Sequence, residues 1–89
     1  MSYEAVESID PRDHPGAPVA ETILGTYELE DDAIAVARAA REAFLESGSL
    51  DYAWWIVRVP GMTVARWIAD SSSNKEFVLD LRSGELVEY

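Results

Sequence analysis

Residues 52–70 constrain the fold more than any other segment, because large apolar side chains occupy both odd and even positions there. Successive side chains of a β-strand point to opposite faces of its sheet. A sheet with one face in water alternates apolar and polar residues, and this segment does not alternate in that way. We therefore predict that both faces of the sheet need cover, from the chain itself, from a second copy or from a partner protein.

The segment divides into two predicted strands, residues 52–59 and 62–70, separated by Pro60-Gly61. Proline and glycine are preferred at the two central positions of a type II turn. If the pair forms a two-residue hairpin loop, Trp54 lies opposite Trp67. One face of the hairpin then carries Tyr52, Trp54, Ile56, Ala65 and Trp67, and the other carries Trp55, Val57, Val59, Met62, Val64 and Ile68.

Residues 31–47 form the clearest predicted helix. Its apolar stripe consists of Ala33, Val36, Ala37, Ala40 and Phe44, widened by Ile34 and Leu45. Carboxylates at its start match the positive end of the helix dipole and can cap free N–H groups, and Gly48 suits the left-handed residue that follows a helix. Arg41 does not fit, because it falls within the apolar arc. One such helix covers only one face of the sheet.

The remaining segments complete a small α+β domain. Residues 21–29, 76–82 and 85–89 are predicted strands, and Gly25 marks a bulge or a close backbone approach. The predicted order is β-α-β-β-β(-β), with one amphipathic helix on a small antiparallel sheet and a single domain over residues 21–89. Residues 1–20 are predicted to be extended or partly mobile because they are rich in proline, with residues 3–9 as a candidate N-terminal edge strand.

The chain of 89 residues has 17 acidic and 7 basic residues and a formal net charge of -10. Residues 1–51 hold 12 acids and 3 bases, while residues 52–89 hold 5 acids and 4 bases. Such a field repels nucleic acid and anionic membranes and attracts basic surfaces, so we expect no direct binding to nucleic acid or membrane. The absence of cysteine excludes thiolate chemistry, and a cytoplasmic location is the default expectation.

No group of residues predicts catalysis, a metal site or a cofactor. Asp10, Asp13 and His14 are the one cluster of acids with a histidine, and they lie in a proline-rich loop at a spacing that fits no zinc or calcium site. Residues 71–75 lack the glycines of a phosphate-binding loop and are better explained as a hairpin loop. We therefore predict no catalytic residue, no metal ligand and no cofactor.

The composition favours a non-enzymatic protein-interaction module with two contact surfaces. The first is an aromatic sheet face, predicted from Tyr52, Trp54, Ile56 and Trp67. The second is an acidic surface that would steer the chain toward a basic partner protein, predicted from Glu28, Glu30, Asp31, Asp32, Glu42 and Glu46. A homodimer that closes through the aromatic face is the alternative to a separate partner.

Two other functions stay open from the sequence. A small acidic protein can act as a nucleic-acid mimic that blocks a nucleic-acid-handling enzyme, as phage inhibitors of restriction or CRISPR nucleases do, because carboxylates replace phosphates along a basic groove. The other is a small-molecule-binding domain, with a ligand between helix and sheet beside Tyr27 and Phe44 and with Arg41 as its anion anchor. Arg41 packing its stem at the sheet edge, with its guanidinium in water, is the structural alternative.

Overall fold

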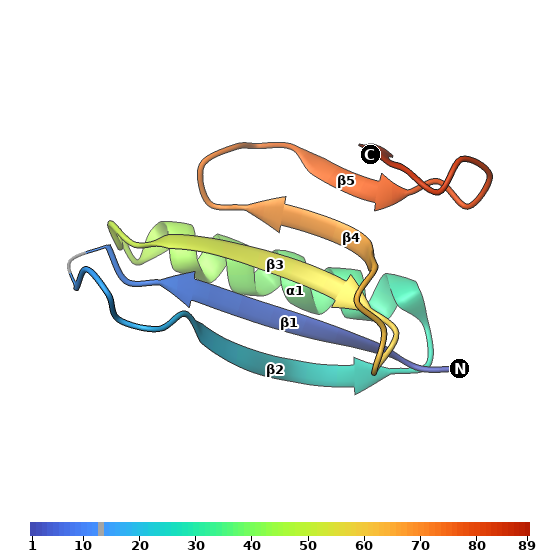
Figure 1. Cartoon of the computed structure of the whole chain (residues 1–89), viewed down its shortest axis with the longest axis horizontal. Helices are drawn as coiled ribbons and strands as arrows, with labels where there is room; N and C mark the ends of the chain where they lie inside the picture. Colours follow the sequence, from blue (N-terminus) through green and yellow to red (C-terminus); the bar gives the residue numbers. More distant parts are fainter. Residues whose placement is uncertain (13) are drawn as a thin grey trace.

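The computed structural model describes residues 1–12 and 14–89, and it shows one helix on one face of a six-stranded antiparallel sheet (Figure 1). The strand order across the sheet is β2-β1-β3-β4-β5-β6. The elements are β1 (Tyr3–Asp10), β2 (Ala20–Tyr27), α1 (Glu30–Glu46), β3 (Tyr52–Arg58), β4 (Ala65–Asp70), β5 (Glu76–Leu79) and β6 (Leu86–Glu88). The prediction of an α+β fold with one helix packed on an antiparallel sheet is confirmed.

The N-terminal strand β1 lies second in the sheet and pairs with both β2 and β3. The candidate strand predicted over residues 3–9 is therefore confirmed as a strand, but it lies inside the sheet and not at its edge. Both glutamates of this strand have a hydrogen-bond partner in the fold. Glu4 accepts a charged hydrogen bond from Arg58 Nε at 2.7 Å, and Glu7 accepts the Trp55 indole N–H at 2.9 Å.

Helix α1 packs its small residues against large aromatic residues of the sheet. Ala33, Ile34 and Ala37 are buried, and they join Trp55 and Trp67 in one core cluster. The predicted apolar stripe is confirmed, except that Leu45 is exposed. No side chain caps the N-terminus of α1, whereas Gly48 follows the helix in a left-handed conformation (φ +71°), as predicted. Alanines on the helix leave room for indole rings beneath it, which is why one short helix can close this core.

The register of the β3–β4 hairpin differs from the predicted one. Pro60 and Gly61 do form a turn, with the Met62 amide donating to the Val59 carbonyl at 3.0 Å and Gly61 at φ +82°. The strands, however, do not continue from it, because β4 begins only at Ala65 and Val57 lies opposite Trp67. A type II turn splays the two strands of a hairpin, so the residues after the turn leave the ladder. The longer loop shifts every side chain of β4 relative to β3.

The two outer strands of the sheet are β2 and β6. Strand β2 carries a bulge at Leu24, because Ala5 pairs with Gly25 while Val6 pairs with Ile23. The Tyr27 ring lies directly over Gly25, where an added Cβ would stand 2.8 Å from Tyr27 Cζ. Gly25 thus marks both a bulge and a close approach. Across the described part of the chain, no helix has the length and apolar character that crossing a membrane requires.

Candidate functional site

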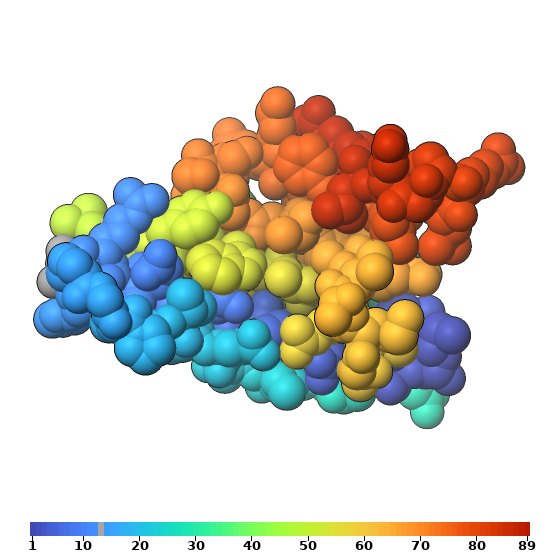
Figure 2. Space-filling view, viewed as in Figure 1, coloured from blue at the N-terminus to red at the C-terminus, as the bar shows by residue number. Residues whose placement is uncertain are grey.

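The sheet face opposite α1 carries a cavity of about 440 Å³ over strands β3, β4 and β5. Strand register brings its walls together: Trp54 lies opposite Asp70, and Ile68 lies opposite both Ile56 and Phe77. Figure 2 shows this open face, where atoms of β3 reach the surface between the N-terminal and C-terminal strands. Its principal lining residues are Tyr52, Trp54, Ile68, Asp70, Lys75 and Phe77. We call this cavity the aromatic pocket.

Hydrogen bonds fix the β3–β4 side of the aromatic pocket. The Tyr52 and Trp54 rings lie 5.7 Å apart at an interplanar angle of 39°. The Tyr52 hydroxyl donates to Asp70 Oδ2 at 3.0 Å, and the Ser72 amide and hydroxyl donate to Asp70 Oδ1 at 3.0 and 3.2 Å. Partial burial, and then the hydrogen bond to Asp70, raise the pKa of the Tyr52 phenol above its ordinary value. The Asp70 carboxylate is therefore held in one orientation beside the aromatic rings.

Arg41 holds the loop between β4 and β5 from the helix side. Its Nε donates to the Asp70 carbonyl at 2.9 Å, and its Nη2 donates to the Ser73 carbonyl. Both donors bind backbone carbonyls of the loop that forms one rim of the aromatic pocket. Arg41 is therefore not a cation with its guanidinium in water, which was the alternative to an anion anchor. The predicted ligand space between helix and sheet is instead filled by core side chains, among them Phe44 packed edge-to-face on Trp55 with ring centroids 5.5 Å apart.

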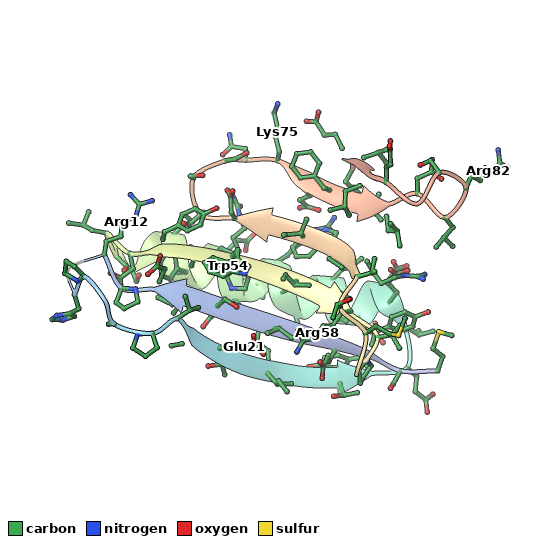
Figure 3. The ribbon with its side chains drawn as sticks, in the orientation of Figure 1. Arg12, Glu21, Trp54, Arg58, Lys75 and Arg82 are labelled. Carbon is green, nitrogen blue, oxygen red and sulfur yellow. The ribbon has the colours of Figure 1, made fainter. Side chains whose placement is uncertain are left out.

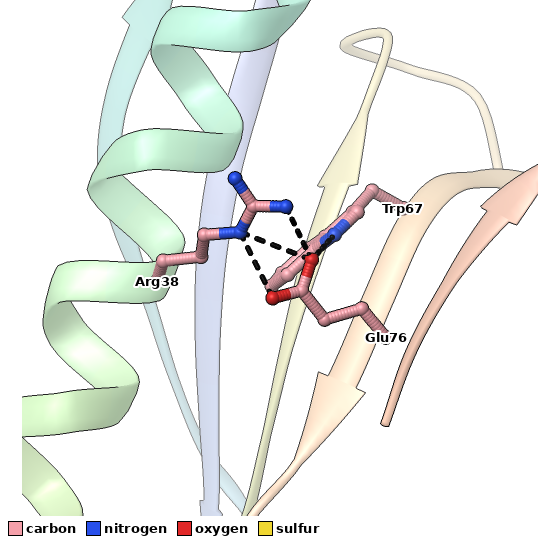
Figure 4. Close-up of polar contacts among 3 residues, drawn as sticks. All are labelled: Arg38, Trp67 and Glu76. Atoms are coloured by element: carbon pink, nitrogen blue, oxygen red, sulfur yellow. Dashed lines mark hydrogen bonds and ion pairs between the residues drawn. The ribbon is translucent and has the colours of Figure 1, made fainter. Parts of the chain in front are cut away.

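On the β5 side of the pocket, Glu76 connects the sheet to helix α1 through hydrogen bonds. It accepts hydrogen bonds from Arg38 Nε at 2.9 and 3.0 Å, from Arg38 Nη2 at 2.5 Å and from the Trp67 indole at 3.0 Å (Figure 4). The Arg38 hydrogen bond, followed by that of Trp67, lowers the pKa of the Glu76 carboxyl. Because Glu76 points to the helix side, its neighbour Phe77 points to the open face and lines the aromatic pocket.

Three of the four residues predicted for the aromatic face lie together on the open face of the sheet. Tyr52, Trp54 and Ile56 share the open face, as β-strand alternation requires. Trp67 does not belong with them: it is fully buried on the helix side, because the shifted register places it beside Val57. Phe77 and Ile68 take its place on the open face. The sequence does show that Phe77 and Leu79 alternate with other residues and so share one face of their strand. The position of Phe77 beside Ile68, however, depends on strand register, which was not predicted correctly.

The predicted acidic surface lies on the opposite side of the molecule from the aromatic pocket. Helix α1 lies behind the sheet in Figure 1, while Trp54 is in front of it in Figure 3. Glu30 forms an ion pair with Arg66 Nε at 3.2 Å. Within residues 1–12 and 14–89, the other predicted acids have no ion pair: Glu28, Asp31, Asp32, Glu42 and Glu46. The helix acids and the aromatic pocket are therefore on opposite sides of the sheet.

Two basic side chains stand near the aromatic pocket, Arg12 and Lys75 (Figure 3). The Arg12 guanidinium lies 5.4 Å from the centroid of the Tyr52 ring. The Lys75 side chain points away from the sheet. Arg58, on the same face, is engaged by Glu4 at 2.7 Å and by Glu21 at 3.3 Å, and its hydrogen bond to Glu4 raises the pKa of its guanidinium.

The described residues contain no group of three or more His, Asp or Glu side chains arranged to hold a metal ion. Asp13, which belongs to the acid–histidine cluster considered from the sequence, lies outside the described residues. Comparison with known protein families, with curated proteins and with solved structures gave no match. The site must therefore be interpreted from its own geometry.

Proposed function

We propose that the protein is a non-enzymatic interaction module that binds a partner protein through the aromatic pocket on its open sheet face. The observation that carries this proposal is an apolar cavity of about 440 Å³ on a face that the helix does not cover. Its volume lies within the range typical of binding pockets, roughly 300–1,000 Å³. Aromatic side chains around such a cavity are the residues that most often anchor protein interfaces.

The polar groups of the pocket support binding better than catalysis. Three donors already engage the Asp70 carboxylate, and the Ser73 hydroxyl accepts the Lys75 backbone N–H at 3.0 Å. These groups shape the loop between β4 and β5. We therefore assign no reaction to them, and our proposal keeps a cytoplasmic location because the chain has no cysteine.

The net charge of -10 supports a basic partner. A field of this sign accelerates encounter with a positive surface and keeps polyanions away. Since the unpaired acids of α1 lie behind the sheet, they attract the partner over distance while the aromatic pocket makes the contact. This division of roles predicts that salt affects the association rate more than the stability of the complex once formed.

A second candidate function rests on the same acids. The exterior of α1 presents Asp31, Asp32, Glu42 and Glu46 without ion pairs among the described residues. An acidic inhibitor that occupies the nucleic-acid channel of a basic enzyme would bind through this surface. It would not need the aromatic pocket.

Two variants on opposite faces separate these functions. The tagged protein is used to capture partners from its native host lysate, with nuclease added, at low and high salt. Trp54→Ala tests the aromatic pocket, and the combined neutral change of Asp31, Asp32, Glu42 and Glu46 to their amides tests the helix. Leu81→Ala, at an exposed position outside the pocket, is the matched control.

We expect Trp54→Ala to abolish capture of a stoichiometric partner, whereas the neutralised helix retains the partner and binds it more slowly. Capture that survives Trp54→Ala and is lost with the neutralised helix would favour the acidic inhibitor. Recovery of the bait alone, as a dimer by light scattering that Trp54→Ala converts to a monomer, would assign the open face to self-association.

A further inference from the structure

We call the space between Trp54 on β3 and Phe77 on β5 the slot of the aromatic pocket. Ile68 on β4, the strand between them, lies opposite Phe77, and Trp54 lies opposite Asp70 on the same strand. Neighbouring strands are about 4.8 Å apart, so the backbones of β3 and β5 are separated by about 10 Å. A backbone separation of this size leaves room for one flat or extended side chain between the two rings. Aromatic ring faces carry negative electrostatic potential and attract cations.

One end of the slot is acidic. The Asp70 carboxylate lies there, with Asp10 paired to Tyr52 on the neighbouring strand β1 and Asp51 next to Tyr52 in sequence. Among the described residues, two cations lie near this end: Arg12, whose backbone N–H donates to Asp51 at 3.3 Å, and Lys75, which lines the pocket. The three acids outnumber these two bases, and the net charge of the whole chain is -10. Charge at this end therefore favours a cationic guest.

The molecule already uses the contact that such a guest would make. Arg12, Arg38 and Arg66 each place the guanidinium carbon over a tyrosine ring, at 5.4, 5.1 and 5.7 Å from the ring centroid. The first of these rings is Tyr52, at the margin of the slot. A planar guanidinium stacks on an indole better than an ammonium group does, and it can donate to a carboxylate at the same time.

We propose that the aromatic pocket binds an arginine side chain of the partner, with its guanidinium stacked on Trp54 and donating to the Asp70 carboxylate. This inference rests on the proposed function, because it names the chemistry by which the partner is recognised. Lys75 sharpens the test, because it lines the pocket on the β5 side and its charge repels the same guest even though its side chain points away from the sheet. Removing the charge of Asp70 and removing that of Lys75 must therefore act in opposite directions.

The test uses the three indole N–H resonances of the 15N-labelled protein. The Trp55 indole is bound to Glu7 and the Trp67 indole to Glu76, so both serve as internal controls for folding. Trp54→Phe assigns the third resonance. The probes are the tripeptide acetyl-Gly-Arg-Gly-amide and its neutral isostere, in which citrulline replaces arginine.

We expect the arginine tripeptide to shift the Trp54 resonance alone and the citrulline tripeptide to bind more weakly. Asp70→Asn keeps an acceptor for Tyr52 and Ser72 and should weaken arginine binding about tenfold, the factor for one lost charge-assisted hydrogen bond. Lys75→Gln should tighten it about threefold. Asp80→Asn is the matched control, because Asp80 accepts similar loop hydrogen bonds from Arg82 and Ser83 outside the pocket.

Equal shifts from both tripeptides, or weaker binding in Lys75→Gln, would overturn the inference, and the second result would indicate an anionic guest. The outcome is separable from that of the proposed function. If partner capture needs Trp54 but the arginine tripeptide gives no shift, the inference alone fails. If the tripeptide binds as expected and capture does not need Trp54, the proposed function fails and an arginine pocket remains.

Discussion

Tryptophan residues have opposite environments on the two faces of the sheet. On the face that α1 covers, Trp55 and Trp67 are completely buried and each indole N–H donates to a glutamate. On the open face, Trp54 is only partly buried, and its indole has no hydrogen-bond partner among the described residues. Burial of an indole requires an acceptor, so the first two tryptophans belong to the core, and our proposal assigns the third to binding.

Replacing tryptophan on each face gives the largest expected contrast. Trp67→Ala should lower the free energy of unfolding by about 3–5 kcal/mol, because a fully buried ring leaves a cavity. Trp54→Ala should lower it less, by about 2 kcal/mol, because this ring is only partly buried. Denaturant unfolding followed by circular dichroism measures both. Equal losses from the two variants would contradict the assignment of one face to stability and the other to binding.

A smaller loss of stability is expected at Glu76, which accepts the hydrogen bond of the buried Trp67 indole. Glu76→Ala removes the acceptor of Trp67 and the partner of Arg38, and should cost about 2 kcal/mol. Glu76→Gln retains a carbonyl acceptor for the indole and should cost about half as much. The comparison uses the same unfolding measurement. If the two variants were equally destabilised, the ion pair with Arg38, rather than the indole hydrogen bond, would carry the effect.

The hairpin between β3 and β4 depends on contacts that local sequence patterns do not report. The apolar stripe of α1 and the glycine after it depend on local spacing, and both were predicted. The face of Trp67 depends on how many residues leave the ladder after Pro60-Gly61, which is decided by strand twist and by packing under the helix. The lining of the aromatic pocket was predicted where it lies on one strand, at Tyr52 and Trp54, and was missed where it comes from a second or third strand, at Ile68 and Phe77.

The contacts of Arg41 and the inner position of β1 in the sheet were not predicted, for a related reason. Both depend on partners that lie far along the chain. Arg41 binds carbonyls 29 and 32 residues away, and Glu4 binds an arginine 54 residues away. Periodicity within one segment does not report such contacts.

The pH dependence of stability sharpens the contrast between paired and unpaired acids. The folded pKa of Glu76 lies below its ordinary value of 4.5, so its contribution is complete above that value and is lost as the pH falls through the lower folded pKa. Thermal unfolding between pH 6 and acid pH should therefore show a decline below about pH 4.5 that is shallower in Glu76→Gln. An identical decline in both proteins would assign acid sensitivity to other carboxylates.

The smallest effects are expected on the exterior of α1, with opposite signs at its two ends. Asp31→Asn, in the first turn, should lower the free energy of unfolding by about 0.5 kcal/mol, because the carboxylate faces the positive end of the helix dipole. Glu46→Gln, in the last turn, should raise it by about 0.3 kcal/mol. A precise urea titration of both variants resolves the signs. Two changes of the same sign would mean that net charge, and not the dipole, governs this surface.

The bulge at Leu24 has a consequence for how copies of the chain can associate. An unpaired outer strand is a template on which further strands add, and it can propagate a sheet from one molecule to the next. Here one margin of the sheet is kinked at Leu24 and the other ends in a strand of only three residues. Neither offers a long straight row of free amides and carbonyls. Growth into filaments by strand addition is thereby disfavoured.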